Sequence, residues 1–110
     1  MTQNTNVRAL LLAALVTIPG YVAAAPSPEQ TCARMISDGR ANGMDQAICL
    51  CVYRVAEEVL DANIRALLFD SWYTGRDNMA AVQQLPRQGR VTRQMGKMQR
   101  TAARSCPGAF

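Results

Sequence analysis

The stretch that decides the fold covers residues 46–60 and reads QAICLCVYRVAEEVL. At about 100° per residue, its apolar side chains form one stripe along a helix, and its charged side chains cluster on the opposite side. The stripe consists of Ile48, Val52, Val55 and Val59, and the charged side of Arg54, Glu57 and Glu58, continued by Asp61 just after the stretch. Cys49 and Cys51 fall on the two borders of the stripe, so the helix offers one sulfur to a neighbour on each side. We therefore predict that this is the central helix of the fold.

The chain has four cysteines, Cys32, Cys49, Cys51 and Cys106, and no histidine. An even number of cysteines in a short exported chain is typical of a disulfide framework. Without histidine, a zinc site would need all four cysteines as thiolate ligands. In an oxidising compartment cysteines more often pair as disulfides, so we favour disulfides and expect neither a metal nor a cofactor. Cys32 should pair with either Cys49 or Cys51, and Cys106 with the other. No strong physical reason separates these two patterns; we place Cys32–Cys51 with Cys49–Cys106 first.

The first residues show the three-part pattern of a secretory signal peptide. A short polar start contains Arg8, an apolar stretch follows, and a run of small residues ends at Ala25. The apolar stretch is about half of the roughly 20 residues that a membrane-spanning helix needs, so we expect cleavage after Ala24 rather than an anchor. Residues 1–24 are then a signal peptide. Residues 25–110 form a single domain, periplasmic or secreted, without a transmembrane segment.

Helix caps and breakers predict where the first helices begin and end. Ser27 can cap a helix, Pro28 suits its first position and Gln30 completes a capping box. This helix should end at Gly39, because glycine readily adopts the left-handed conformation that ends helices. Asp45 is the expected cap of the central helix.

Three further helical segments are expected after the central helix. Asp61 should cap the first of them and Gly75 should end it, although the pattern also allows one bent helix through Asp61. Its buried face would consist of Ile64, Leu67, Leu68 and Trp72. A short helical turn follows Asp77, and the last helix should run from about Arg90 to Ser105. Its apolar stripe would consist of Val91, Met95, Met98 and Ala102. The expected fold class is all-α: a small disulfide-stapled bundle of four to five helices.

Most catalytic arrangements are missing from the sequence. Without histidine there is no imidazole base, and neither a glycine-rich phosphate loop nor a nucleophile elbow is present. Glu57 and Glu58 are adjacent on a helix, so their carboxylates diverge. We therefore expect a protein that is not an enzyme.

Two sulfur motifs allow other interpretations. Cys49 and Cys51 could form a thiol–disulfide redox pair, although their sulfurs point about 200° apart on a helix and a bond between them would be strained. Met95 and Met98 have a spacing seen in exported copper(I) proteins, because thioethers suit that ion. Both methionines lie on the apolar stripe of the last helix, which favours core packing.

The charge distribution gives the clearest functional signal. Residues 84–110 contain six cations and no acid, whereas residues 25–83 contain five cations and eight acids. Arg93, Lys97, Arg100 and Arg104 follow helical spacing on the face opposite the apolar stripe. Because a solvated face usually mixes both signs of charge, this pattern indicates an anionic partner. Three interpretations stay open: a passive solvated face, an internal partner, namely the acids at positions 57, 58 and 61, or an external partner.

These observations predict a non-catalytic binding or adaptor module that acts through the basic face of its last helix. The external partner would be an acidic protein, or a lipid or glycolipid head group of the envelope, and we expect no nucleic acid in this compartment. The alternative is a periplasmic redox protein that uses Cys49 and Cys51.

Overall fold

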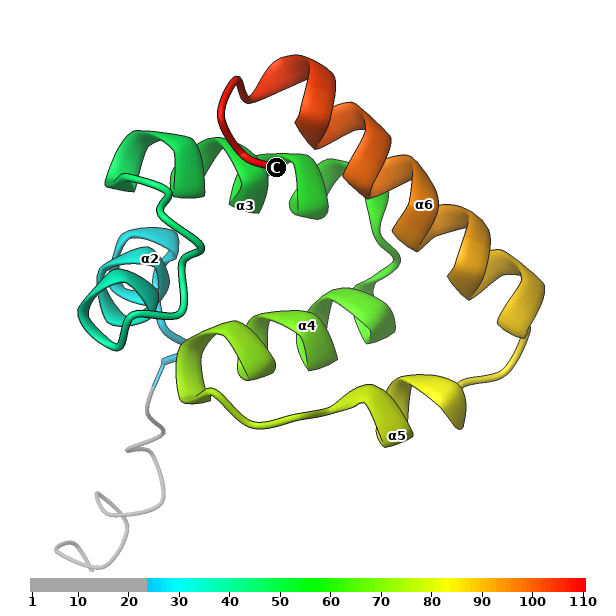
Figure 1. The fold of residues 1–110 in the computed structure, drawn as a ribbon. Helices are drawn as coiled ribbons and strands as arrows, with labels where there is room; N and C mark the ends of the chain where they lie inside the picture. Colours follow the sequence, from blue (N-terminus) through cyan, green and yellow to red (C-terminus); the bar gives the residue numbers. More distant parts are fainter. Residues whose placement is uncertain (1–23) are drawn as a thin grey trace, which may run out of the picture.

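A computed structural model describes residues 24–110, which form five helices and contain no strand (Figure 1). The helices are α2 (Pro28–Ser37), α3 (Gln46–Val59), α4 (Ala62–Thr74), α5 (Met79–Gln83) and α6 (Gln88–Ser105). The all-α class and the number of helices are thus confirmed for this part of the chain. The predicted signal peptide lies outside the described residues, except for Ala24. No helix within residues 24–110 is both long and apolar enough to span a membrane.

Two of the predicted helix starts are confirmed in atomic detail. The Gln30 backbone N–H donates to Ser27 Oγ (3.1 Å), and the Ser27 N–H donates to Gln30 Oε1 (2.9 Å), which completes the capping box of α2. At the start of α3, the Ile48 N–H donates to the Asp45 carboxylate at 2.8 Å. These bonds satisfy backbone donors that have no partner inside the helix.

The junction between α3 and α4 differs from the prediction. Leu60 has an extended backbone (φ −89°, ψ 138°), so the two helices are separate rather than one bent helix. Asp61 precedes α4, but its side chain makes no capping hydrogen bond. Its carboxylate instead binds Arg90 of α6. An ion pair with a distant guanidinium has therefore replaced the expected local cap.

The central position of α3 is confirmed by its neighbours and by both disulfides. It packs against α2 on one side and against α6 on the other. The bonds are Cys32–Cys49 to α2 and Cys51–Cys106 to the end of α6. The pattern that we placed first, Cys32–Cys51 with Cys49–Cys106, is therefore wrong. Helical spacing puts Cys49 and Cys51 on opposite borders of α3, but it does not say which border faces which neighbour.

Helix α4 is less buried than its sequence pattern predicts. Ile64 is fully buried, whereas Leu67, Leu68 and Trp72 are only partly buried. Leu68 and Trp72 line a hollow of about 400 Å³ that also borders α3 and α6. Part of the apolar face of α4 thus packs on the core, and part borders a space that the neighbouring helices leave open.

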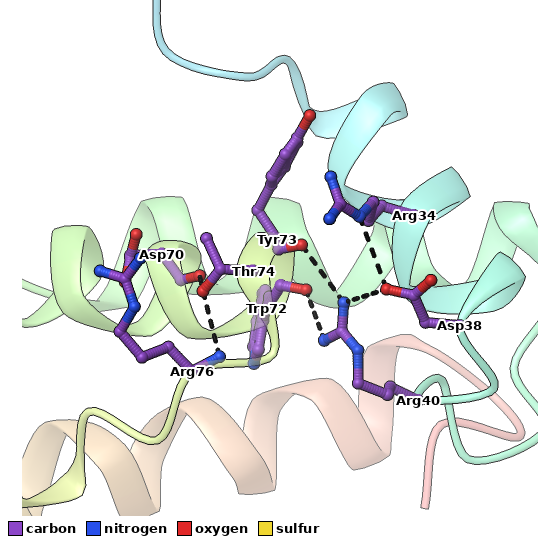
Figure 2. A network of polar contacts seen from close by, with 8 residues as sticks. All are labelled: Arg34, Asp38, Arg40, Asp70, Trp72, Tyr73, Thr74 and Arg76. Carbon is purple, nitrogen blue, oxygen red and sulfur yellow. Dashed lines mark hydrogen bonds and ion pairs between the residues drawn. The ribbon is translucent and has the colours of Figure 1, made fainter.

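The loop between α2 and α3 is tied to the end of α4 by Arg40 (Figure 2). Its Nη1 donates to the Trp72 carbonyl (2.7 Å), and its Nη2 donates to the Tyr73 carbonyl (3.2 Å) and to the Asp38 carboxylate (3.0 Å). Carbonyls in the last turn of a helix lack an intrahelical partner and carry partial negative charge, so a guanidinium stabilises them. Gly75 ends α4 with φ 78°, and a Cβ there would lie 3.3 Å from Arg40 Nε. The positive φ favours glycine here, and a larger residue would also have to displace the Arg40 side chain.

Candidate functional site

Helix α6 is held so that one side faces the core and the other faces solvent. Val91, Met98 and Ala102 are buried, and Met95 is partly buried. The Cys51–Cys106 disulfide joins the C-terminal end of α6 to α3. Figure 1 shows α6 at the edge of the helical assembly, where its outer side is not covered by another helix.

The cations selected from the sequence lie on this outer side. All four residues are exposed: Arg93, Lys97, Arg100 and Arg104. None of them forms an ion pair with a carboxylate of residues 24–110. We call these four residues the basic face. Three of them surround a shallow depression of about 350 Å³ together with Arg90 and Gln94, whereas Arg104 lies farther along the helix.

Two glycines bring guanidinium groups close to the helix backbone. Arg100 Nη1 lies 3.1 Å from the point where a Cβ on Gly96 would stand, and Arg93 Nη1 lies 3.4 Å from the corresponding point on Gly89. In each pair the arginine follows the glycine by four residues, so both lie on the same side of α6. Our sequence reasoning missed these glycines, although the repeated glycine-to-arginine spacing was visible.

Internal pairing, which the sequence left open, involves Arg90 rather than the basic face. Arg90 Nε and Nη2 donate to the two oxygens of Asp61, at 2.6 and 3.0 Å. This guanidinium holds the pKa of the Asp61 carboxyl well below its usual range, and Asp61 in turn raises the pKa of Arg90. Gln94 adds to the junction, since its Oε1 accepts the Asp61 backbone N–H at 2.7 Å. Arg90, which we had not included among the site residues, is therefore a structural cation.

The other internal candidates do not reach the basic face. Glu57 and Glu58 are exposed on α3, and neither forms an ion pair among the described residues. The Glu57 backbone carbonyl accepts a hydrogen bond from Arg65 (2.9 Å), which belongs to α4. The charge of the basic face is thus not neutralised within residues 24–110.

The four cysteines are all in disulfides, so none is free among the described residues. Cys49 and Cys51 are bonded to different helices and not to each other. Disulfides persist in oxidising compartments and are rare in the cytosol, so the two bonds indicate a non-cytosolic environment.

Met95 and Met98, the possible copper motif, both line the hollow beside α4. Residues 24–110 contain no group of three or more His, Cys, Asp or Glu side chains arranged to hold a metal ion. Comparisons with known protein families, with curated proteins and with solved structures find no match for this chain.

Proposed function

We propose that this protein is an exported, non-catalytic binding or adaptor module that holds an anionic partner on the basic face of α6. The observation that supports this most strongly is that one cation of α6 is paired with an acid of the protein and the others are not. Arg90 takes up the nearby carboxylate of Asp61, whereas Arg93, Lys97 and Arg100 surround an open depression without an acid. Like charges at helical spacing weaken a helix slightly, so an external anion would relieve their repulsion.

The chemistry of the basic face indicates which anions it would prefer. Three of its four cations are arginines, whose planar guanidinium groups bind carboxylate and phosphate oxygens in pairs. The partner in this proposal is an acidic protein, or the phosphate-bearing head group of a lipid or glycolipid, in the periplasm or outside the cell. The predicted signal peptide and the oxidising environment implied by the disulfides agree with that location.

Charge reversal on the basic face tests the proposal. The variant Arg93→Glu/Arg100→Glu/Arg104→Glu should lose binding to phosphatidylglycerol vesicles, lipopolysaccharide or acidic envelope proteins. Its helicity and thermal stability should stay close to wild type, because these side chains are exposed and form no ion pair among residues 24–110. A variant that unfolds would mean that the arginines belong to the fold, and one that still binds would exclude the basic face.

A matched control separates the basic face from net charge. Arg54→Glu/Arg65→Glu/Arg76→Glu changes the charge by the same amount on α3, on α4 and just after it. Because Arg65 donates to the Glu57 carbonyl and Arg76 pairs with Asp70, helicity and thermal stability are measured for this control too. This control should keep most of the binding. Equal loss in both triple variants would show that overall charge, and not the basic face, attracts the anion. Wild-type binding should also weaken steeply from low to physiological salt, because exposed charges are screened beyond about 8–10 Å.

The alternative function, thiol–disulfide exchange by Cys49 and Cys51, gains no support from the geometry. Each of these cysteines joins α3 to a different helix, so reducing either bond would release a structural connection. Counting free thiols on natively purified protein tests it. A pair of cysteines that is easily reduced and reoxidised would favour exchange. No free thiols, before or after mild reductant, would favour structural disulfides.

A further inference from the structure

The hollow beside α4 lies on the opposite side of α6 from the basic face. It has a volume of about 400 Å³ and is bordered by α2, the α2–α3 loop, α3, α4, α6 and the C-terminal segment. Binding sites for small molecules occupy roughly 300–1,000 Å³, so the hollow is large enough for one. The exposed Asn42 and Gln99 are among its lining residues and mark where it opens to solvent.

The walls of this hollow are mainly apolar and adaptable. Four methionines from separate parts of the fold line it, namely Met35, Met44, Met95 and Met98. Methionine is unbranched and flexible, so such walls adjust to a ligand of irregular or variable shape. Leu68 and Trp72 add the apolar surface of α4 that the fold leaves partly uncovered. A ligand that covered this surface would gain the free energy of apolar burial.

Among residues 24–110, Arg40 is the only side chain lining the hollow that carries a charge. Three hydrogen bonds to protein acceptors use part of its five N–H groups, and Nε has no acceptor among residues 24–110. Asp38 accepts from Arg40 and also lies 3.5 Å from Arg34 Nε, so this cluster of two arginines and one aspartate is cationic overall (Figure 2). The edge of the hollow therefore suits an anionic head group.

We propose that the hollow binds a single flexible acyl chain of the fatty-acid class, with the chain among the methionines and the carboxylate at Arg40. An apolar cavity with one cation at its edge is complementary to an amphiphile of this kind. The inference concerns a second site, distinct from the basic face, and does not depend on the proposed function.

Trp72 gives a direct readout, because it is the only tryptophan of the chain and lines the hollow. Bromine-labelled dodecanoic acid, kept below the concentration at which it forms micelles, should quench tryptophan fluorescence saturably, since bromine quenches only on close approach. Dodecanoic acid should displace the labelled acid about tenfold more effectively than dodecanol or dodecylamine, because of the three only the carboxylate is negatively charged and can form an ion pair with Arg40. Absence of saturable quenching would overturn the site, and displacement by the amine as good as by the acid would overturn the role of Arg40.

A cavity-filling variant tests the location without weakening the core. Ser71 lines the hollow from α4, and Ser71→Leu should reduce affinity for the labelled acid at least about tenfold while keeping the protein folded. The matched control Ala66→Leu adds the same side chain on α4 outside this hollow and should bind like wild type. The triple glutamate variant of the basic face should also be quenched normally. Unchanged quenching in Ser71→Leu, or loss in the basic-face variant, would place the acyl chain elsewhere.

Discussion

Arg90 donates to both carboxylate oxygens of Asp61, with Nε–Oδ2 at 2.6 Å and Nη2–Oδ1 at 3.0 Å. The pair connects the first turn of α6 to the junction between α3 and α4, which are far apart in sequence. It also occupies the Asp61 carboxylate, which pairs with Arg90 and with none of the four cations of the basic face. This ion pair thus stabilises the fold, while the four cations of the basic face form no ion pair within the described part of the chain.

The Asp61–Arg90 pair should make stability depend on pH in a defined direction. The folded pKa of Asp61 lies below its unfolded value, so the pair stabilises the protein above that unfolded value, near pH 4, and this contribution is lost as pH falls further. Asp61→Asn should therefore be less stable than wild type at neutral pH, and the difference should shrink on acidification. Urea unfolding of both proteins between neutral pH and about pH 3 measures this. A difference that stays constant with pH would contradict the pair.

The two disulfides should differ in what they contribute. Cys51–Cys106 spans 55 residues and Cys32–Cys49 spans 17, so in the chain-entropy account the first stabilises by about 4 kcal/mol and the second by about 3 kcal/mol. A domain of this size has a free energy of unfolding of only about 5 kcal/mol. Cys51→Ser/Cys106→Ser should therefore be marginally stable or unfolded, and Cys32→Ser/Cys49→Ser less affected.

The disulfide pattern itself can be read by partial reduction and alkylation. Trypsin alone is not sufficient, because no lysine or arginine separates Cys49 from Cys51. Peptides should link Cys32 to Cys49 and Cys51 to Cys106. Any bond between Cys49 and Cys51 would contradict the central position of α3.

Gly96 should lower the stability of α6 but leave room for the Arg100 guanidinium on the basic face. Alanine in a helix interior is more favourable than glycine by about 1 kcal/mol, so Gly96→Ala should raise the free energy of unfolding. The new Cβ would lie 3.1 Å from Arg100 Nη1, so the guanidinium must move and anionic vesicles should bind more weakly. Gly89→Ala is the matched control, because its Cβ would lie 3.4 Å from Arg93 Nη1, an ordinary contact. If Gly96→Ala bound such vesicles as well as wild type, the arrangement of Arg100 over Gly96 would have no role in binding.

Features determined by neighbouring residues could be predicted from the sequence. The capping box at Ser27, the cap at Asp45 and the helix end at Gly75 depend on groups within four residues, and the structure contains all three. The apolar stripe of α6 was visible for the same reason, since helical spacing alone places Val91 and Met98 together.

Features that depend on how helices sit relative to one another could not be predicted. Cys49 and Cys51 had two equivalent pairings until the positions of α2 and α6 around α3 were known. Aspartate is a common helix cap, but the carboxylate of Asp61 binds the guanidinium of Arg90, which is 29 residues away in the sequence. Trp72 lies on a face with the pattern of a buried stripe, yet it is only partly buried, because part of that face borders a hollow.

The most direct measurement of the central claim is a residue-resolved amide NMR titration of the isotopically labelled protein with two anionic probes. The probes are nanodiscs of phosphatidylglycerol and a polyglutamate peptide, which represent the phosphate and the carboxylate partner. At low salt, at least one probe should perturb the α6 amides around Arg93, Lys97, Arg100 and Arg104, and added salt should reverse the effect. Perturbation centred on α2, α3 or α4, or no perturbation by either probe, would contradict the account.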